Sequence, residues 1–358
     1  MAHLTRDEVL KSGEVSEFVA VSNDFLPKQK QQALFVISSD SQAFESRPVD
    51  ITGDDFFAHR ASRADHLLRL RHLYPIPGPI PDLVQESLHD VPTRDGASIR
   101  VKVYQSVAGP PEDGSPLIMM YHEGGWSMGD LTDEDLNCRM FARDLRAVCV
   151  NVEYRLAPEH KFPTGVHDCY DALLWSLKNS ATLNATPSRG LLVGGASAGG
   201  NIAAVLALLA RDEKLSPPIT GQYLCVPALL PDTNVPPNLV PLYLSRTQST
   251  NDPVLKGIPP GMIEEIYAPD PKSPLWDPFN HPDGHEGVAK AFFQVGGLDP
   301  LRDEAVLYDR ILRENGILTR FELYAGYGHM FWTNYPELEE SEKFVKDTLN
   351  GVKWLLGK

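Results

Sequence analysis

One serine of this sequence lies in a setting that favours nucleophilic chemistry. The segment Gly195-Ala196-Ser197-Ala198-Gly199 fits the pattern G-x-S-x-G. Three apolar residues precede it and an Ala/Leu-rich run over 202–210 follows it, so the sequence predicts a buried strand, a tight turn and a helix. A Cβ at position 195 or 199 would collide in such a turn. The serine would then lie at a helix N-terminus, whose partial positive charge favours a developing anion.

Such short matches also occur by chance, so the assignment depends on partners in the right order. Acyl transfer by a serine requires a base and a carboxylate that orients the base. Asp299 follows the apolar run 291–295, and His329 follows the run 319–324. We therefore predict that Ser197 attacks a carbonyl, that His329 moves its proton, and that Asp299 fixes the imidazole.

Each partner also has a plainer interpretation. Asp299 could cap the helix predicted from residue 302, and His329 could be a loop histidine packed under Phe331 and Trp332. Asp303 competes for the carboxylate role, but it comes one helical turn later, so we expect it to cap the helix or to form a surface pair.

A glycine pair elsewhere in the chain could bind the oxyanion of such a reaction. His122-Glu123-Gly124-Gly125-Trp126 directly follows the predicted strand 116–121. Consecutive glycines let backbone N–H groups turn toward one point without side chains in the way. We predict that the N–H groups of Gly124, Gly125 and Ala198 form the oxyanion hole. The alternative is an ordinary glycine turn.

The elements around these residues predict an α/β fold. Runs 84–92 and 98–105 alternate around Arg94-Asp95-Gly96 and predict a hairpin. From 116 to 226, predicted strands at 116–121, 147–152, 191–193 and 222–226 alternate with helices at 133–145, 165–177 and 202–210. This alternation implies a mostly parallel sheet with helices on both faces. Further along the chain, the sequence again predicts regular secondary structure, with strands at 291–295 and 319–324 and helices at 302–315 and 337–356.

Two segments do not fit this alternation. Residues 1 to about 73 show helical amphipathic patches, and a Pro-rich break at 74–81 follows them. The stretch 227–282 holds 13 of the 30 prolines, and a loop of this length is usually a lid or a binding loop. We therefore predict an N-terminal helical cap segment and linker over 1–81 and a catalytic core over 82–358. The cap or lid insertion lies at about 227–285.

Composition excludes several classes of partner. The net charge of −15 argues against nucleic acid and against an anionic membrane surface. No run approaches the ~18 apolar residues of a membrane span, and the N-terminus lacks the basic flank and apolar core of a signal peptide. The four cysteines form no C-x-x-C pair, which favours reduced thiols and a cytoplasmic setting. No residue pattern indicates a particular oligomeric state.

These motifs together resemble the hormone-sensitive-lipase-like family of α/β-hydrolases, over roughly residues 85–355. The resemblance rests on the motifs 122–126 and 195–200, on Tyr154-Arg155-Leu156-Ala157-Pro158-Glu159, on Asp299-Pro300-Leu301-Arg302-Asp303 and on Gly328-His329. It is closest to members from filamentous fungi, many of which act in secondary metabolism. The resemblance implies a helical cap, the triad and oxyanion donors given above, and a supporting role for the 154–159 segment. It implies no cofactor.

One departure from the family concerns the reaction itself. Glu123 replaces the first glycine of the usual His-Gly-Gly-Gly loop. It either points away and orders the loop, or it lies near the oxyanion site, where its carboxylate would weaken anion stabilisation or act as an additional acid/base on the substrate. Trp126, Phe331 and Trp332 either line the substrate pocket or pack in the core. His281, Asp283 and His285 form a weak metal-ligand pattern, and we expect no metal.

Two reactions follow from this interpretation. The first is hydrolysis of a carboxylic ester through an acyl-enzyme on Ser197, with a small-molecule or polyketide-like ester or lactone as substrate. The second keeps the fold and promotes cyclisation, elimination or condensation, with His329 and Glu123 as acid/base. A ligand receptor on the same scaffold is a third reading, but a receptor would not require an intact Ser, Asp and His set.

Overall fold

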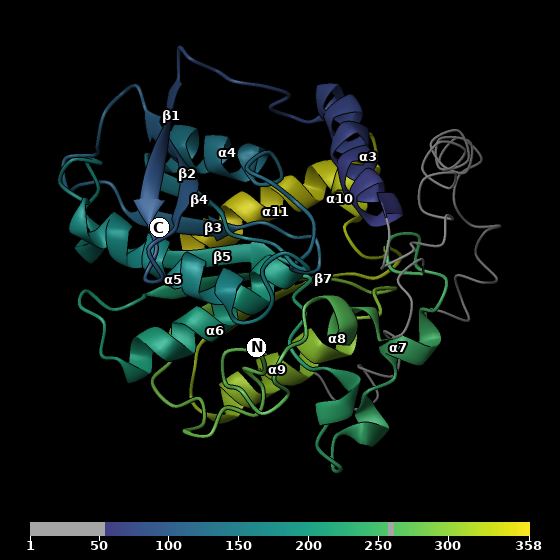
Figure 1. Ribbon diagram of the computed structural model, residues 1–358. Coiled ribbons are helices and arrows are strands. Elements are labelled where there is room, and N and C mark those ends of the chain that lie inside the picture. The colour runs from purple at the N-terminus through teal and green to yellow at the C-terminus, as the bar shows by residue number, and fades with distance from the viewer. Residues whose placement is uncertain (1–53, 257–260) are drawn as a thin grey trace.

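A computed structural model describes residues 54–256 and 261–358 (Figure 1). Its centre is one sheet of eight strands in the order β1-β2-β4-β3-β5-β6-β7-β8. Their bounds are β1 Val84–Pro92, β2 Ser98–Ser106, β3 Leu117–Tyr121, β4 Val148–Glu153, β5 Leu191–Ala196, β6 Gly221–Cys225, β7 Lys290–Gly296 and β8 Thr319–Tyr324. Each predicted strand matches one of these, with ends that differ by at most three residues.

The sheet is antiparallel at one edge and parallel elsewhere. The hairpin β1–β2 pairs residue by residue from Val84 with Ser106 to Pro92 with Ser98, and β2 runs antiparallel to β4. The pairs from β4 through β3, β5, β6 and β7 to β8 are all parallel. Every residue of β3, β5 and β6 is buried, as expected for strands covered on both faces. The carboxyl ends of the parallel strands therefore share one edge, where the candidate residues follow them.

Helices cover both faces of the sheet. Helices α4 (Asp135–Leu145) and α11 (Glu339–Leu355) pack on one face, and α5 (Thr164–Lys178), α6 (Ala198–Asp212) and α9 (Arg302–Glu314) lie on the other (Figure 1). Two hydrophobic cores result, one on each side of the sheet. All four cysteines are buried free thiols. The predicted fold class, an α/β-hydrolase fold with a mostly parallel sheet, is confirmed.

The segments outside the alternation contribute short elements beside the carboxyl edge of the sheet. The Pro-rich stretch contains η3 (Asp232–Asn234), η4 (Val240–Leu242), α7 (Ser245–Gln248) and α8 (Met262–Ile266). The N-terminal segment contributes α3 (Asp54–Leu70) and η1 (Arg71–Leu73), and α3 lies against α10 (Phe331–Asn334) (Figure 1). The helical patches predicted before residue 54 lie outside the described residues, and the predicted boundaries of the cap stay predictions.

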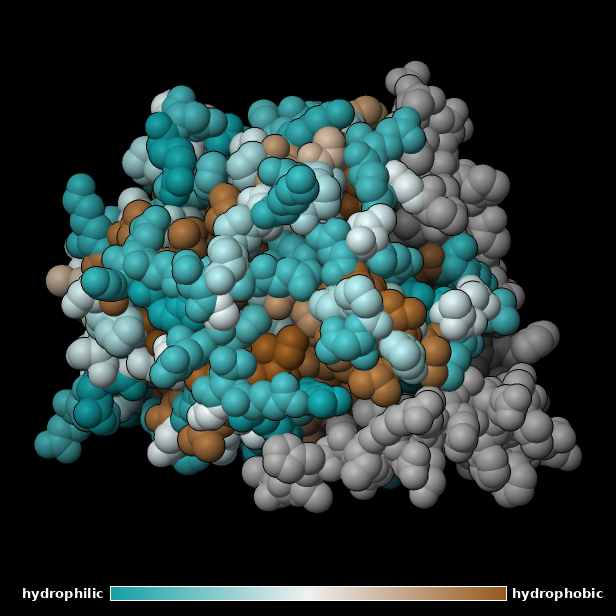
Figure 2. All heavy atoms as spheres, turned by 90° about the horizontal axis from the view of Figure 1, so that it is seen from below, coloured by the Kyte–Doolittle hydropathy of each residue, from teal (hydrophilic) through white to brown (hydrophobic). Residues whose placement is uncertain are grey.

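The face of the molecule seen from below is largely hydrophilic (Figure 2). Figure 2 shows a face on which hydrophilic side chains predominate and hydrophobic ones form separate patches between them. None of the helices within 54–256 and 261–358 combines the length and the apolar composition that crossing a bilayer would require.

Candidate active site

Ser197 lies at the sharp turn between β5 and α6, in a strained backbone conformation. Its φ of 53° and ψ of −114° lie outside the regions that non-glycine residues prefer. The glycines on either side allow this turn, because a Cβ on Gly195 or on Gly199 would overlap the carbonyl oxygen of Tyr121. A Cβ on Gly200 would lie 2.8 Å from the Cβ of Pro227. The predicted steric role of the glycines is therefore visible in the structure.

The three residues predicted to act together converge at the carboxyl edge of the sheet. Ser197 Oγ lies 3.0 Å from His329 Nε2, and His329 Nδ1 lies 2.8 Å from Asp299 Oδ2. An ionised carboxylate can only accept a hydrogen bond, so His329 donates Nδ1–H to Asp299 and accepts the serine hydroxyl proton at Nε2. The hydroxyl, the imidazole and the carboxylate thus have the relative geometry of an activated nucleophile.

The imidazole is buried next to negative charge. Burial disfavours the imidazolium, but the charge and the hydrogen bond of Asp299, together with the charges of Asp252 and Glu123, outweigh this effect, so the pKa of His329 is raised from its usual value. Asp299 Oδ1 accepts 2.8 Å from the backbone N–H of Leu301, which fixes the carboxylate at the start of α9. Leu301 precedes α9, and this helix has no side-chain hydrogen bond at its N-cap, so Asp299 contacts the imidazole and the turn before the helix rather than capping the helix itself.

A second carboxylate, which the sequence did not single out, holds the loop that carries His329. Asp252 Oδ2 accepts 2.7 Å from the backbone N–H of His329, and Asp252 Oδ1 accepts from the N–H groups of Val254 and Leu255. Asp252 is 4% exposed. Burial, followed by the charge of Asp299, raises its pKa. The Pro-rich stretch has no periodicity that distinguishes this aspartate from its neighbours, so only the fold reveals the contact.

The predicted oxyanion loop has an unusual backbone. Gly124, Gly125 and Trp126 have φ values of 112°, 59° and 58° in succession. A Cβ on Gly124 would overlap the carbonyl of Met128, so this turn requires a glycine there. Ala198, the third predicted donor, begins α6 directly after Ser197.

The 154–159 segment braces this loop from below. Tyr154 donates its hydroxyl to the carbonyl of His122 over 2.9 Å, and the two rings stack with centroids 4.1 Å apart. The N–H of Ala157 donates to the carbonyl of Trp126, also over 2.9 Å. Both ends of the predicted oxyanion motif are thus held by one neighbouring segment, in agreement with the supporting role that the resemblance implied.

Glu123 turns its side chain toward helix α3. Its Oε1 accepts 2.9 Å from Arg63 Nη2, and its side chain is 5% exposed. Burial, followed by the charge of Asp133, raises the pKa of Glu123 although Arg63 opposes the shift. These contacts are of the kind expected for a residue that orders the loop.

The aromatic candidates make their ring contacts with other core residues. Trp126 stacks on Tyr267 with ring centroids 5.2 Å apart and lies 4.6 Å from Trp276, so it belongs to an aromatic cluster with two residues of the Pro-rich stretch. Trp332 stacks on Phe344 of α11 at 3.8 Å, and Phe331 packs on Phe344 and on Tyr324 of β8. The contacts of Phe331 and Trp332 are those of the core-packing alternative, and a pocket role for the three residues stays a prediction.

Acidic residues after Asp299 anchor the Pro-rich stretch. Asp303 Oδ2 accepts from the N–H groups of Leu244 and Ser245 at 2.6 and 2.7 Å. Glu304 is fully buried and accepts from the N–H groups of Leu229 and Leu230 at 2.6 and 2.9 Å. We expected Asp303 to cap the helix or to form a surface pair, but it is buried, α9 has no side-chain cap, and Asp303 accepts backbone N–H groups of the Pro-rich stretch instead. Buried backbone N–H groups require an acceptor, and the carboxylate of Asp303 is buried because it accepts two of them from the Pro-rich stretch.

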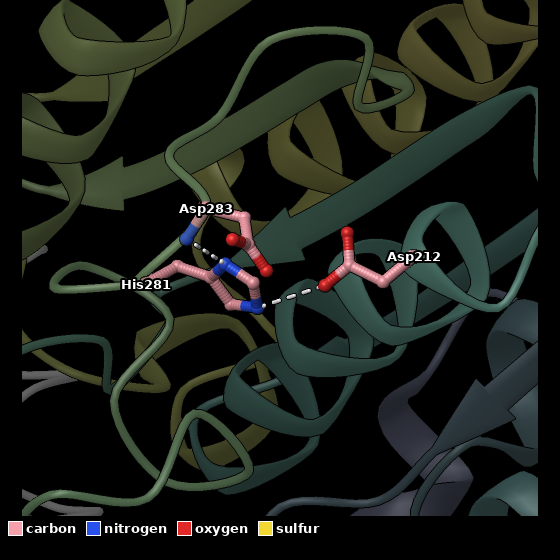
Figure 3. Close-up of side chains that lie close together, drawn as sticks. All are labelled: Asp212, His281 and Asp283. Carbon is pink, nitrogen blue, oxygen red and sulfur yellow. Dashed lines mark hydrogen bonds and ion pairs between the residues drawn. The ribbon is translucent and has the colours of Figure 1, made fainter.

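In the structure, Asp212 lies beside two residues of the weak metal-ligand pattern, His281 and Asp283. Asp212, His281 and Asp283 bring ligand atoms within 4.8 Å of one another, at the opposite end of α6 from Ser197 (Figure 3). His281 Nε2 lies 3.2 Å from Asp212, and His281 Nδ1 accepts from the N–H of Asp283 at 3.3 Å. Arg211 pairs with Asp212 at 2.6 Å. Protein groups thus occupy both ring nitrogens, and the absence of a metal stays a prediction.

Several proteins that this chain resembles in sequence and in structure are named as esterases. Residues 118–333 match a family model described as an alpha/beta hydrolase fold. An AB hydrolase superfamily protein of Schizosaccharomyces pombe is 39% identical over 278 residues, which cover 78% of this chain and 82% of the relative. Versiconal hemiacetal acetate esterase of Dothistroma septosporum is 30% identical over 286 residues, which cover 79% of this chain and 84% of that protein.

A solved structure extends the similarity to three dimensions. The crystal structure of vibralactone cyclase superposes with a TM-score of 0.80 at 30% identity, over 87% of this chain and 91% of that chain. The matched family model spans the oxyanion loop, the elbow, Asp299 and His329. The chain therefore belongs to the α/β-hydrolases, as an esterase-type enzyme of the hormone-sensitive-lipase-like group.

Proposed function

We propose that the protein hydrolyses a small carboxylic ester through an acyl-enzyme on Ser197. The observation that carries the proposal is the chain of contacts from Ser197 Oγ to His329 Nε2 at 3.0 Å and from His329 Nδ1 to Asp299 at 2.8 Å. Each group is at most 8% exposed, which strengthens its electrostatic interactions.

The reaction would follow the steps that this geometry permits. Ser197 Oγ attacks the ester carbonyl as His329 Nε2 takes its proton, and the negative oxygen is bound by the N–H groups of Gly124, Gly125 and Ala198. The imidazolium then protonates the departing alcohol, which leaves an acyl group on Ser197. A water molecule repeats the sequence with the acyl-enzyme and releases the carboxylic acid. Asp299 stabilises the imidazolium in both halves.

The substrate class is proposed from the relatives and from the site. A fungal relative is named as an esterase of versiconal hemiacetal acetate, and this supports a secondary-metabolite ester or lactone as substrate. Trp126, Tyr267 and Trp276 supply an aromatic cluster next to the oxyanion loop, on which a ring-bearing substrate could pack.

The test compares wild type with Ser197→Ala on p-nitrophenyl esters of increasing acyl length. We expect the wild type to hydrolyse short-chain esters, and we expect the variant to lose on the order of 10⁵-fold or more in kcat. The chain-length profile then bounds the acyl pocket. Turnover by the variant at a rate near that of wild type would contradict the proposal.

A second candidate reaction is favoured by one structural neighbour. Vibralactone cyclase shares the fold and 30% identity, and its name denotes a ring-forming reaction. In this reading His329, with Glu123, would transfer protons during cyclisation, elimination or condensation of a bound intermediate. Ser197→Ala should then leave most of the activity on the true substrate, whereas His329→Gln should abolish it.

A further inference from the structure

The oxyanion loop is joined to helix α3 by an ion pair between a half-buried arginine and a buried glutamate. Arg63, on α3, donates from Nη2 to Glu123 Oε1 at 2.9 Å, and its Nη1 lies 3.6 Å from Asp133 Oδ1. Glu123 is 5% exposed and Asp133 is 3% exposed, so both carboxylates depend on protein partners. One guanidinium therefore connects α3 to both ends of the 123–133 loop.

This loop has a conformation that it would not hold by itself. Three successive residues, Gly124 to Trp126, have positive φ, and two of them are glycines with large conformational freedom when unconstrained. Donors in an oxyanion hole are effective only when they are fixed before charge develops. The segment 154–159 holds the loop from below, and Arg63 holds the side chain of Glu123 from the cap side.

The ion pair also balances charge beside the site. Carboxylates of Glu123, Asp133 and Glu134 gather here, and the Glu123 charge reaches the imidazole of His329. A buried carboxylate that loses its partner is strongly unfavourable, and the loop would rearrange to bring it to water. Removing Arg63 would thus move the residue that immediately precedes the two glycine donors.

Helix α3 is placed to transmit this constraint because it is anchored on both sides of Arg63. On α3, Arg60 donates to the carbonyl of Ala157 at 2.6 Å and pairs with Glu159. Arg71, in η1 directly after the helix, donates to the carbonyl of Thr132 at 2.7 Å. This part of the chain thus contacts the 154–159 segment on one side of Arg63 and the C-terminal end of the 123–133 loop on the other.

We propose that Arg63 is a positioning residue, through which the docked helix α3 holds Glu123 and thereby the oxyanion donors in their working geometry. Glu123, which replaces the usual glycine, then serves to accept the hydrogen bond from Arg63 of α3 and does not act as an acid/base. This inference rests on the proposed esterase function of Ser197, and it makes transition-state stabilisation depend on the N-terminal segment.

The test is a cycle of Arg63→Ala, Glu123→Gln and the double variant, assayed with a p-nitrophenyl ester. Arg69→Ala is the matched control, because it removes the same charge from an exposed position of the same helix. We expect Arg63→Ala to lower kcat by about 10- to 100-fold with KM within about twofold, since a misplaced donor costs transition-state binding. Arg69→Ala should stay within about twofold of wild type.

The double variant shows whether Arg63 acts through Glu123 or whether the two substitutions lower kcat independently. Glu123→Gln in the Arg63→Ala background removes the stranded charge, so the double variant should be at least as active as Arg63→Ala. Losses that multiply would overturn the proposal, as would a folded Arg63→Ala variant with the kcat of wild type. If Arg63→Ala does not fold, Glu123→Gln alone should lower kcat with little change in KM, and an unchanged kcat would then overturn the proposal.

Amide hydrogen exchange gives a readout that does not depend on activity. Peptides that cover residues 122–133 should exchange faster in Arg63→Ala than in wild type or in Arg69→Ala, and equal exchange would overturn the proposal. If the wild-type protein hydrolyses no ester and Ser197 is not labelled by a fluorophosphonate, the proposed function fails. The exchange comparison still decides whether Arg63 holds the loop.

Discussion

The carboxylate of Asp252 accepts a 2.7 Å hydrogen bond from the backbone N–H of His329, so the Pro-rich stretch directly holds the loop that carries the imidazole. The two residues are 77 positions apart in the sequence. The charge of Asp299 contributes to the raised pKa of Asp252, and the charge of Asp252 contributes to the raised pKa of His329. His329 is thus placed between one carboxylate that contacts its ring and another that contacts its backbone.

Replacing Asp252 by Asn should shift the pH dependence of catalysis. The negative charges of Asp299, Asp252 and Glu123 raise the pKa of His329, against the effect of burial. Asn keeps one acceptor for the backbone N–H but removes one of these charges. The pKa of His329 should therefore fall, and the acidic limb of the kcat/KM profile should move to lower pH. The profile of the wild type, measured with the same ester, is the reference.

An acidic limb that stays in place in Asp252→Asn would show that the charge of Asp252 does not act on His329. Asp252→Ala serves as the companion variant, because it removes the acceptor as well. It should lower kcat further than Asn does, since the loop then has an unpaired buried N–H.

Replacing Asp299 by Asn should lower kcat by roughly 10³- to 10⁴-fold with a small change in KM. The amide cannot stabilise the imidazolium, and it can force the ring into the wrong tautomer. Asp303→Asn is the matched comparison, because Asp303 lies four residues further and accepts backbone N–H groups of the Pro-rich stretch instead. A larger loss of kcat in a folded Asp303→Asn variant would reverse the assignment of the triad carboxylate.

Replacing Gly199 by Ala should destabilise the fold severely. The new Cβ would overlap the carbonyl oxygen of Tyr121, and the backbone of a central strand cannot move away cheaply. A loss of about 3 kcal/mol or more in the free energy of unfolding is expected. Gly78→Ala is the control, because nothing lies within 4 Å of its new Cβ. Chemical denaturation of both variants measures the difference, and equal midpoints would contradict the steric account of the elbow.

The sequence predicted those parts of the molecule that depend on local periodicity and on glycine sterics. The strands around Met119 and Val193 are apolar throughout because both faces are covered, and the glycines at 195 and 199 are required by the approach of β3. The convergence of Ser197, Asp299 and His329 could be predicted because each follows a parallel strand, and the carboxyl ends of such strands share one edge.

Contacts between distant segments could not be predicted in this way. Asp252 lies in a stretch without periodicity, and Arg63 lies 60 residues from Glu123, so neither pairing has a local signal. The order of the motifs put Phe331 and Trp332 close to His329 in sequence, and in the structure their rings pack against Phe344 of α11. Proximity in sequence to a catalytic residue does not determine which way a side chain points.

The central claim is that Ser197 is the nucleophile, and covalent labelling tests it most directly. The protein would be treated with a fluorophosphonate, and the adduct would be located by mass spectrometry of its peptides. We predict one adduct per chain, on the peptide that contains Ser197, with none in Ser197→Ala and much slower labelling in His329→Gln. A wild-type protein that hydrolyses esters but carries no adduct on Ser197, or carries it on another residue, would contradict the claim.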